Sequence, residues 1–543
     1  MANRAPRSTS HLRPPLGTTI DQRHPWPIPG WGGGGWNRRE LLESFAATFA
    51  AATALGALRS PAWAATLATA AAADPSALPS ELWRAGAGQL AEAIAQRQVS
   101  SVEVIEAHLA RIAAVNAKVN AIPVVFADEA RAAAKAADAA VKSGAKLGPL
   151  HGVPFTIKDN LDQAGKANTD GIEENKGLIA KLDAPVVERM KAAGGIPLGR
   201  TNLPDLALRV HSYSELWGRC LNPWNSKRNV GGSSGGEAAA LAAGMTPIGL
   251  GNDIGGSLRN PANCCGIAAL KPTFGRIPHA SEGGAGGAAG QLMAVNGPMA
   301  RSIADVKLGY QILSGQHVRD PWSMPVPLDL PDPPGPIKVA LVPEPSGGKT
   351  HPDVAEGVRK AGKALAGAGY VVEEIEPPRL AQAFDIWMEF LGSELYEGMD
   401  YFEQVMSPEA FKFLDLVMQH FEFKQLGGYV GSLAARHALA SEWSEFFTRY
   451  PLVVGPVFTQ PPFEVGYDVA GVDQAWDVMN QLRVVVAVNL LGIPAVALPV
   501  GVAGGLPMGV QVIGDRFRED LALDAAAAIE RAAGTITPID PKA

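Results

Sequence analysis

Two glycine-rich loops hold the residue types best suited to chemistry. Seventeen of the 60 glycines fall within residues 231–297. One loop is residues 231–236 (GGSSGG), and the other is residues 251–259 (GNDIGGSLR). Glycine adopts backbone conformations that other residues avoid, and it lets the chain approach a ligand closely. The serines in these loops are therefore candidate nucleophiles, although a hydroxyl group needs a base before it attacks.

Two interpretations of these loops do not involve a lysine base. The segment GSSGG formally matches the G-x-S-x-G nucleophile elbow, which needs a strand directly before it and a histidine and an acid elsewhere. Residues 225–230 (NSKRNV) are instead polar and loop-like, and none of the downstream histidines has a distinctive setting. A Gly/Ser loop before a helix also suits phosphate, but the Gly-Lys-Ser/Thr of a nucleotide-binding loop is absent.

In the third interpretation, the side chain of a lysine acts as the base. Residues 152–160 (GVPFTIKDN) place Lys158 at the end of an apolar strand. Burial would lower the pKa of this lysine towards the neutral form, which can accept a proton. Taken alone, Lys158 fits a surface position or a salt bridge better than a catalytic base, so the residues by themselves leave the base open.

Helical and strand patterns alternate around these loops. Amphipathic helices are predicted over residues 82–97, 102–115 and 127–142, and Ser100 with Glu103 forms a capping box before the second helix. Short apolar runs predict strands at 153–157, 196–198, 247–250, 338–342, 495–500 and 510–513. Helices between strands indicate an α/β protein whose sheet is covered on its faces.

Two further segments differ in composition from their surroundings. Residues 325–336 are rich in proline and predict a connection without regular structure. Residues 380–450 are helical in pattern and rich in aromatic residues. We expect this segment to form a lid or a substrate wall, although ordinary helix packing accounts equally well for any single aromatic side chain.

Several separate blocks, in order along the chain, resemble the amidase signature family. The resemblance covers nearly all of the chain after residue 64. It rests on both glycine-rich loops and on residues 152–160, 200–204 (RTNLP), 218–224 (GRCLNPW), 265–266 (CG), 270–273 (LKPT), 489–495 (NLLGIPA) and 505–511 (GLPMGVQ). The family implies one large α/β domain, residues 65–543, with a central mixed sheet covered by helices on both faces.

The resemblance also implies roles for three residues of the loops and the strand. Lys158 would be the base, Ser233 the bridging serine after a cis peptide bond, and Ser257 the nucleophile. In that arrangement Lys158 takes a proton from Ser233, and Ser233 takes one from Ser257, which attacks the amide carbonyl. The backbone N–H groups of Ile254, Gly255, Gly256 and Ser257 would form the oxyanion hole.

Other residues near these motifs receive supporting roles. Ser234, Asp253 and Arg259 are expected to hydrogen-bond around the site. Ala207 matches a substrate-pocket position of the family. The chain departs from the family pattern at Val230 (usually Pro), at Asn252 (usually Thr or Ser), and at residues 168–171 (NTDG), which replace a Thr/Gly/Ser-rich stretch. No departure removes a proposed catalytic atom, so the departures bear on substrate and not on reaction class.

The first 64 residues differ from the rest of the chain. Arg38 and Arg39 precede leucines and an uncharged apolar run at residues 44–58, and residues 62–64 (AWA) fit a cleavage site. This pattern is typical of an export signal of the twin-arginine type. The alternative is an Ala-rich amphipathic helix packed on the domain. Removal of residues 1–64 would leave a net charge of −11, and we expect an exported protein, periplasmic or secreted.

Composition excludes several classes of protein. The net charge of −7 argues against nucleic-acid binding, because phosphate binding needs a basic face. Three cysteines cannot form a disulfide framework or a four-cysteine metal site. From this composition, together with the family resemblance, which implies a small-molecule amide as partner and no cofactor, we expect no metal, no stable membrane span after signal removal, and a monomer or homodimer.

The predicted function is an amidase that cleaves a linear carboxamide or N-acyl amine through an acyl-enzyme on Ser257. Two alternatives stay open at this point. One is the glutamine-hydrolysing subunit of a tRNA-dependent amidotransferase, which shares these motifs but works in the cytoplasm, against the export signal. The other is a catalytically silent binding protein on the same scaffold.

Overall fold

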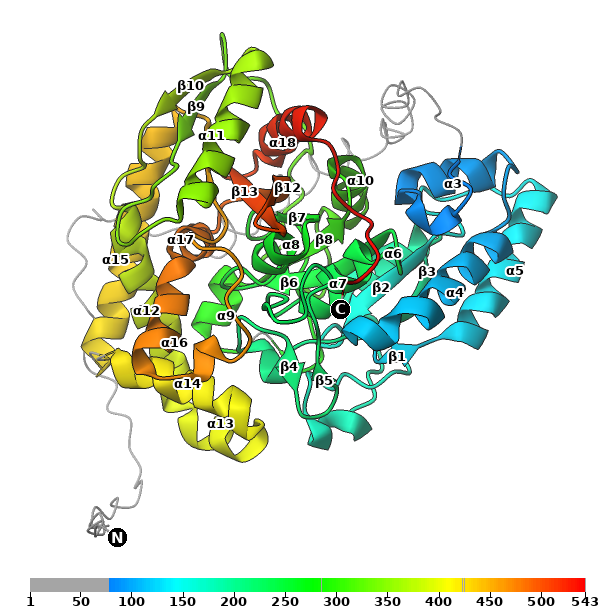
Figure 1. Ribbon diagram of the computed structural model, residues 1–543, viewed down its shortest axis with the longest axis horizontal. Helices are drawn as coiled ribbons and strands as arrows, with labels where there is room; N and C mark the ends of the chain where they lie inside the picture. The colour runs from blue at the N-terminus through cyan, green and yellow to red at the C-terminus, as the bar shows by residue number, and fades with distance from the viewer. Residues whose placement is uncertain (1–77, 285, 422, 424, 543) are drawn as a thin grey trace, which may run out of the picture. The chain divides into compact units, whose positions relative to one another are not determined.

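An eleven-stranded mixed sheet runs through the protein in a computed structural model (Figure 1). The structure describes residues 78–284, 286–421, 423 and 425–542. The strand order is β1-β3-β2-β6-β8-β7-β12-β13-β11-β9-β10. Pairing is parallel in β3-β2-β6 and in β11-β9-β10, and it is antiparallel between β6 and β11. The predicted α/β class with a mixed sheet is confirmed.

The strands are short and mostly buried. The sheet strands are β1 (Val124–Val125), β2 (Pro154–Lys158), β3 (Ile196–Thr201), β6 (Ile248–Asp253), β7 (Ala268–Lys271), β8 (Val295–Ala300), β9 (Lys338–Leu341), β10 (Val371–Glu374), β11 (Leu452–Pro456), β12 (Ala495–Ala503) and β13 (Leu506–Gly514). Two more strands, β4 (Tyr213–Ser214) and β5 (Gly218–Arg219), form a separate pair.

Helices cover the sheet and extend beyond it. They are α3 (Ala87–Ala95), α4 (Ser101–Val119), α5 (Ala127–Ser143), α6 (Pro185–Ala192), α7 (Gly235–Ala242), α8 (Arg259–Cys265), α9 (Ala288–Met293), α10 (Ile303–Leu313), α11 (Pro352–Gly367), α12 (Leu380–Glu397), α13 (Met399–Val405), α14 (Pro408–His420), α15 (Gln425–Phe447), α16 (Val472–Gln481), α17 (Arg483–Leu491) and α18 (Glu519–Ala533). None of the helices in the described ranges combines the length and the apolar character that a bilayer crossing requires.

Each face of the sheet has its own hydrophobic core. Alternate residues of one strand point to opposite faces, and the sheet follows this rule: Val496 and Leu498 of β12 join one core, and Ala495 and Ala497 join the other. The first core also includes residues of α10, α11 and α18, and the second includes residues of α7, α8, α12 and α17. The prediction that helices cover both faces is therefore confirmed.

Tertiary contacts change one predicted helix. The pattern at 82–97 predicts a continuous helix, but the chain forms a 3-10 turn at Leu82–Arg84 and then α3. The Arg301 guanidinium donates to the carbonyl of Ala85, and the carboxylate of Asp305 accepts a hydrogen bond of 2.9 Å from the Gly88 N–H. These distant partners take over backbone groups that a continuous helix would pair internally. The capping box of Ser100 and Glu103 before α4 is confirmed.

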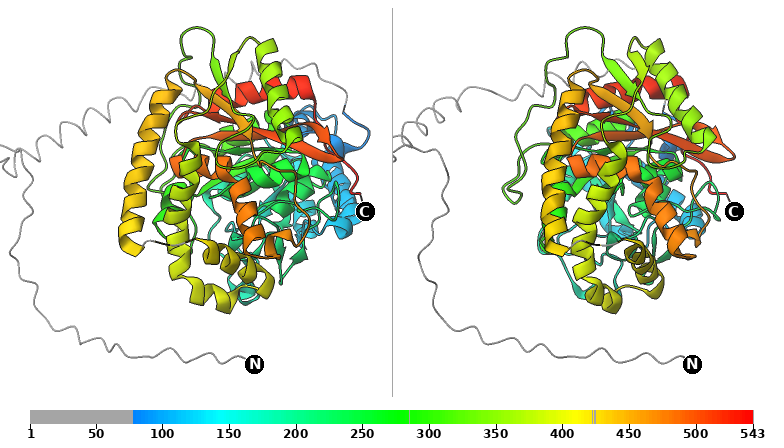
Figure 2. Two further views of the ribbon diagram at one scale, coloured as in Figure 1. Left: turned by 60° about the vertical axis from the view of Figure 1, so that its left-hand side comes forward. Right: turned by 90° about the vertical axis from the view of Figure 1, so that its left-hand side faces the viewer.

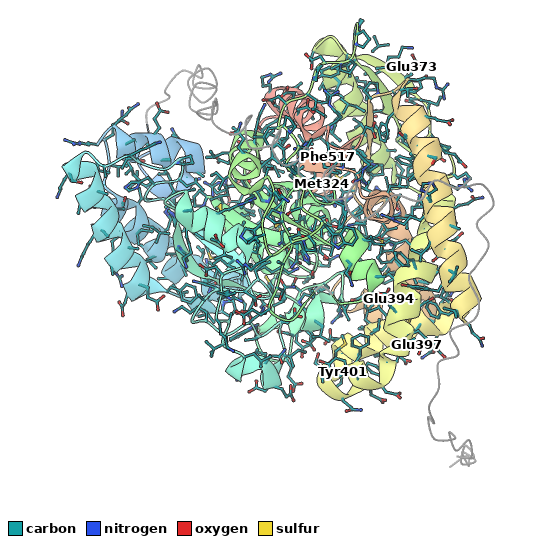
Figure 3. All side chains as sticks on the ribbon, turned by 180° about the vertical axis from the view of Figure 1, so that it is seen from behind. Met324, Glu373, Glu394, Glu397, Tyr401 and Phe517 are labelled. Carbon is teal, nitrogen blue, oxygen red and sulfur yellow. The ribbon has the colours of Figure 1, made fainter. Side chains whose placement is uncertain are left out.

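The segment 380–450 is helical, as predicted, and forms α12 to α15. Helix α15 lies beside α12 in both views of Figure 2. The Tyr429 hydroxyl of α15 donates a 2.6 Å hydrogen bond to Glu394 of α12, whose position is labelled in Figure 3. The same carboxylate accepts from the backbone N–H of Ala289 at the start of α9. These bonds connect the aromatic helices α12 and α15 to α9, which lies between β7 and β8 in the chain.

The predicted leader and export signal at residues 1–64 lie outside the described residues. The described residues belong to one compact unit.

Candidate active site

Lys158 is the last residue of β2, in which all five residues are buried. Its Nζ donates hydrogen bonds of 2.6 Å to the Oγ of Ser233 and 2.6 Å to the Oδ1 of Asn252. Burial lowers the pKa of Lys158 to about 7, although the nearby carboxyls of Asp170, Asp253 and Glu237 raise it. A large fraction of the lysine is therefore neutral near pH 7, which is the form that can accept a proton.

Ser233 lies in the loop that leads into α7, and the Gly232–Ser233 peptide bond is cis. The hydroxyl of the buried Ser212 holds this loop in place. It donates a 3.0 Å hydrogen bond to the carbonyl of Gly231 and accepts a 3.0 Å hydrogen bond from the N–H of Gly235. The side chain of Ser233 is buried against Lys158. The loop thus holds the Ser233 hydroxyl in one place beside the lysine.

Ser257 lies in the loop between β6 and α8 and is partly exposed. Its carbonyl accepts a 3.2 Å hydrogen bond from the backbone N–H of Ser234, so the two glycine-rich loops meet directly. The Ser234 hydroxyl donates a longer bond of 3.4 Å to the carbonyl of Asn252. Ser234 therefore links the loops through its backbone more than through its side chain.

A buried ion pair shapes the second loop from inside. The Asp253 carboxylate accepts backbone hydrogen bonds from Gly256 (2.7 Å) and Leu258 (3.0 Å), and it pairs with the Arg259 guanidinium at 3.1 Å. Burial opposes ionisation of Asp253, but the charge and hydrogen bonds of Arg259 outweigh burial and hold its pKa well below the ordinary value. The Asn489 amide donates a further 2.8 Å bond to the same carboxylate.

This arrangement reduces the set of backbone N–H groups that can act as oxyanion donors. The Gly256 N–H already donates to Asp253, so it is not available to a substrate oxygen, contrary to the expectation from sequence. The amides of Ile254, Gly255 and Ser257 stay as the candidates. The Trp387 indole of α12 donates 3.2 Å to the carbonyl of Ile254, which fixes the orientation of this part of the loop.

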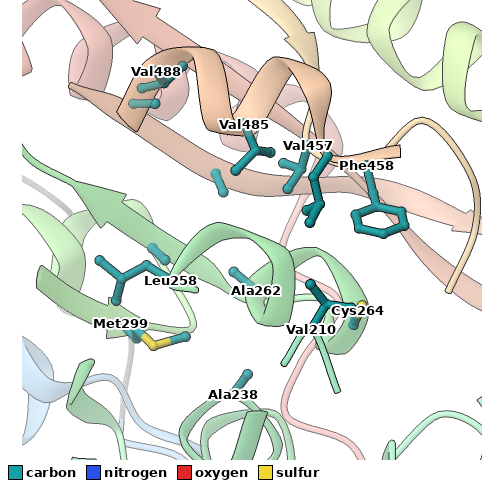
Figure 4. Close-up of a cluster of buried hydrophobic side chains, with 14 of the residues drawn as sticks. Val210, Ala238, Leu258, Ala262, Cys264, Met299, Val457, Phe458, Val485 and Val488 are labelled. Atoms are coloured by element: carbon teal, nitrogen blue, oxygen red, sulfur yellow. The ribbon is translucent and has the colours of Figure 1, made fainter. Parts of the chain in front are cut away.

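Close packing explains both glycines before Ser257. A Cβ atom on Gly255 would lie 2.7 Å from the Trp387 ring, and one on Gly256 would lie 2.4 Å from Val485 of α17. Gly256 also has a φ of +106°, which other residues rarely adopt. Figure 4 shows Val485 of α17 and Ala262 of α8 in the buried cluster between these two helices. The loop can therefore take this shape only with glycine at both positions.

Three residues in or beside the site were not among the predicted site residues: Asn160, Asn252 and Glu237. The Nδ2 of Asn252 donates 2.8 Å to the Oδ1 of Asn160, so both amides lie next to Lys158. Glu237 of α7 is buried and accepts hydrogen bonds from the hydroxyls of Thr156 and Thr201, and burial raises its pKa to about 7. Its sequence signal is a single acid in an otherwise apolar helix.

Ala207 lies in a segment with unusual backbone angles. Leu206 has a φ of +51° and Ala207 a φ of +57°, and the Leu206 N–H donates 2.8 Å to the carbonyl of Asp170. Asp170 itself has a φ of +49°. Non-glycine residues in this region cost free energy and cluster at functional sites. The predicted pocket position is thus next to the departure at residues 168–171.

The cysteines do not contribute to the site chemistry. All three are free and buried, and burial raises the pKa of the Cys264 thiol. Within the described residues, His, Cys, Asp and Glu side chains form no group of three or more that could hold a metal ion.

The comparisons with known proteins agree with the fold and the motifs. The Amidase family model matches residues 103–523. The chain is 41% identical over 460 residues to an indoleacetamide hydrolase of Bradyrhizobium diazoefficiens, which covers 84% of this chain and 88% of that protein. It resembles the solved structure of 6-aminohexanoate cyclic dimer hydrolase with substrate, with a TM-score of 0.73 and 28% identity over 85% of this chain and 99% of that one.

A more distant relative corresponds to one of the alternatives from sequence. A glutamyl-tRNA(Gln) amidotransferase subunit of Anaeromyxobacter dehalogenans is 31% identical over 85% of this chain and 99% of that protein. Fold and comparisons together define an enzyme of the amide-hydrolysing class. The chain belongs to the amidase signature family.

Proposed function

We propose that the protein hydrolyses a carboxamide or N-acyl amine through an acyl-enzyme on Ser257. The observation that carries this proposal is the 2.6 Å contact between the Nζ of Lys158 and the Oγ of Ser233, because both side chains are buried and the lysine pKa is near 7. The hydrogen bond from the Ser234 N–H to the carbonyl of Ser257 places the two loops together, which supports Ser257 as the third residue of the relay.

The reaction follows from these positions. Neutral Lys158 accepts the hydroxyl proton of Ser233, which accepts the proton of Ser257 as its oxygen attacks the amide carbon. The amides of Ile254, Gly255 and Ser257 would stabilise the oxyanion, and the loss of one such donor typically raises the barrier by roughly 2.7–4 kcal/mol. The relay then runs backwards to protonate the leaving amine. Water attacks the ester by the same route and releases the carboxylate.

Two substitutions test this function. Ser257→Ala removes the attacking oxygen, and Lys158→Ala removes the base, so each should lower kcat for amide hydrolysis by at least about 10³-fold. Circular dichroism and thermal unfolding check that the variants fold. Full activity of either folded variant contradicts the proposed roles, and a wild-type protein that hydrolyses no amide favours the silent scaffold.

We also propose that the acyl group is aromatic. Helix α12 places the ring of Trp387 against Gly255, and Phe384, one turn earlier, contacts Trp476 with ring centroids 5.3 Å apart. Trp476 stacks on His420 at 4.1 Å and also lines a cavity of about 1030 Å³. The cavity lining does not include the proposed oxyanion loop, so the support is the Trp387 ring beside Gly255 and a relative of this chain that is an indoleacetamide hydrolase.

A substrate series tests the acyl group. We expect kcat/KM for indole-3-acetamide and phenylacetamide to exceed that for acetamide by roughly 100-fold or more, because each buried methylene contributes about 10-fold or more to discrimination. Long-chain fatty amides serve as the matched apolar control without an aromatic ring. Equal kcat/KM values for aromatic and fatty amides contradict an aromatic pocket but leave the amidase reaction intact.

Residues 1–64 are proposed to direct export by the twin-arginine route. The support is Arg38 and Arg39 before the apolar run 44–58 and the small residues at 62–64. A periplasmic or secreted location follows from this proposal. Export would also separate the enzyme from tRNA, which disfavours the amidotransferase alternative.

A further inference from the structure

Among the described residues, the Nζ of Lys158 has two side-chain hydrogen-bond partners. One is the Oγ of Ser233 and the other is the Oδ1 of Asn252, and both lie at 2.6 Å. The lysine side chain is fully buried between them. Ser233 is already part of the proposed relay, whereas Asn252 stands where the family usually has Thr or Ser.

The two partners differ in the hydrogen bonds that they can make with an amine. A hydroxyl donates and accepts, but an amide oxygen only accepts. A neutral amine has two N–H groups and one lone pair, so the contact with Asn252 uses an N–H of Lys158 in either protonation state. The lone pair cannot point at Asn252 and stays free for the Ser233 hydroxyl. A Thr or Ser at position 252 could instead donate its own proton to that lone pair.

A second amide holds Asn252 in the orientation that presents its oxygen. The Nδ2 of Asn252 donates 2.8 Å to the Oδ1 of Asn160, two residues after Lys158. A reversed Asn252 amide would turn its NH2 group towards the lysine N–H and its oxygen towards the oxygen of Asn160. Both contacts would then be repulsive, so Asn160 favours the observed orientation.

The sheet brings this amide to the lysine. Asn252 lies in β6, two residues after Leu250, which is paired with Ile157 of β2. The register of these two neighbouring strands places Asn252 at the end of β2, where Lys158 lies. The carbonyl of Asn252 also accepts a 3.4 Å hydrogen bond from the hydroxyl of Ser234. Asn252 therefore contacts the base through its side chain and the first glycine-rich loop through its backbone.

We propose that Asn252 is a positioning residue for the base, because its amide oxygen holds one N–H of Lys158 and leaves the amine lone pair for the Ser233 hydroxyl. Asn160 orients that amide. The inference rests on the proposed function, in which Lys158 is the base. When the O–H bond of Ser233 breaks, its proton joins the lone pair, and the ammonium that forms still donates to Asn252. The same contact thus stabilises the charge that the relay creates.

The test follows activation of the serine and needs no knowledge of the natural substrate. The second-order rate constant for labelling of Ser257 by a fluorophosphonate probe is measured from pH 5 to 9 in two variants. Asn252→Leu removes the acceptor, so the plateau rate should fall roughly 10-fold or more, and the acid limb should move to lower pH because the ammonium loses a partner. Asn252→Asp keeps an acceptor of the same shape and adds a negative charge, so its acid limb should move to higher pH.

The opposite directions distinguish positioning from folding. The carboxyls of Asp170, Asp253 and Glu237, which also act on Lys158, are the same in both variants. A role in folding alone would lower the rate at every pH and leave the acid limb in place. Asn252→Asp is close in size to the wild type, so it keeps the test decisive if Asn252→Leu does not fold.

Asn160→Ala tests the orientation of the amide without changing Lys158 or Asn252. Its plateau rate should fall less than that of Asn252→Leu, and adding it to Asn252→Leu should cause little further loss. Asn168→Ala is the matched control, since the amide of Asn168 donates instead to Asp162 at 2.6 Å. Fully additive losses, or an effect of Asn168→Ala as large as that of Asn160→Ala, contradict action through Asn252.

The outcomes separate this inference from the proposed function. No labelling of the wild type, labelling at a residue other than Ser257, or undiminished labelling of Lys158→Ala overturns the proposed function. Correct labelling overturns only the role of Asn252 if the acid limbs of Asn252→Leu and Asn252→Asp stay in place or move in the same direction.

Discussion

At the scale of single residues, the chemistry depends on a lysine that the strand buries. Lys158 ends a strand whose five residues are all inside, so desolvation brings its pKa to about 7. Lys158, which contacts Ser233 directly, can then act as the base in place of a histidine. Arginine could not replace this lysine, because a guanidinium stays charged at any pH that the fold tolerates.

The pKa of Lys158 predicts the pH dependence of the reaction. The protonated lysine cannot accept a proton, so kcat/KM should fall as the pH drops below about 7 and level off above it. Lys158→Arg should lower kcat/KM by at least about 10³-fold at every pH. Rates measured from pH 5 to 9 on one substrate check both expectations. A flat profile over that range contradicts a lysine base.

At the scale of elements, the loop between β6 and α8 is held from its inner side. Asp253 binds two backbone amides of the loop, Arg259 of α8 and Asn489 of α17. Trp387 of α12 contacts the outer side. The adjoining helix α8 and two helices distant in sequence, α12 and α17, therefore determine where Ser257 and the candidate oxyanion donors lie.

Removing the charge of Asp253 should affect both stability and catalysis. Asp253→Asn leaves Arg259 buried without its counter-ion, which typically costs about 3–5 kcal/mol. We expect the free energy of unfolding in urea to fall by that amount, together with kcat. Asp524→Asn is the control, because its ion pair with Lys307 is exposed and worth about 0–1 kcal/mol. Equal effects of the two variants would contradict the role of the buried pair.

The elements were predicted unevenly from sequence, for physical reasons. Strands with continuous apolar runs, such as β2 and β12, were predicted to within a few residues. Strands β7, β8 and β11 were not predicted, because β7 is only four residues long and the runs of β8 and β11 contain glycine and proline. The helix at 82–97 was wrong because Arg301 and Asp305, more than 200 residues away, bind its backbone.

The candidate site, like the fold, could be predicted from the sequence only in part. Lys158, Ser233 and Ser257 came from motifs that resemble a family, since each lies in a short recognisable block. The bridge from Lys158 through Asn252 to Asn160 could not be predicted, because it joins residues more than 90 positions apart. The engagement of the Gly256 amide likewise depends on where the Asp253 side chain points.

At the scale of the whole molecule, one large α/β unit carries the site. Lys158 ends β2, one glycine-rich loop leads into α7, and the other lies at the end of β6. The family match extends over residues 103–523 and so includes the aromatic helices as well as the sheet. The net charge of −7 would become −11 after removal of residues 1–64. Under the export proposal, the mature protein would be an acidic hydrolase outside the cytoplasm.

The export proposal predicts a defect in processing. Arg38→Lys with Arg39→Lys keeps the positive charge but removes the paired arginines that the twin-arginine route reads. The precursor should then stay inside the cell, while the purified variant keeps its amidase activity. Fractionation followed by immunoblotting measures this. Normal export of the double variant would rule out the twin-arginine route.

The most direct test of the account is to trap the covalent intermediate. A p-nitrophenyl ester of an arylacetic acid acylates the enzyme by the same attack as an amide and releases a visible leaving group. After rapid acid quench, mass spectrometry of the wild type should show the added acyl group on the peptide that contains Ser257, and Ser257→Ala should show none. An acyl group on another residue, or turnover by Ser257→Ala at the wild-type rate, would contradict the account.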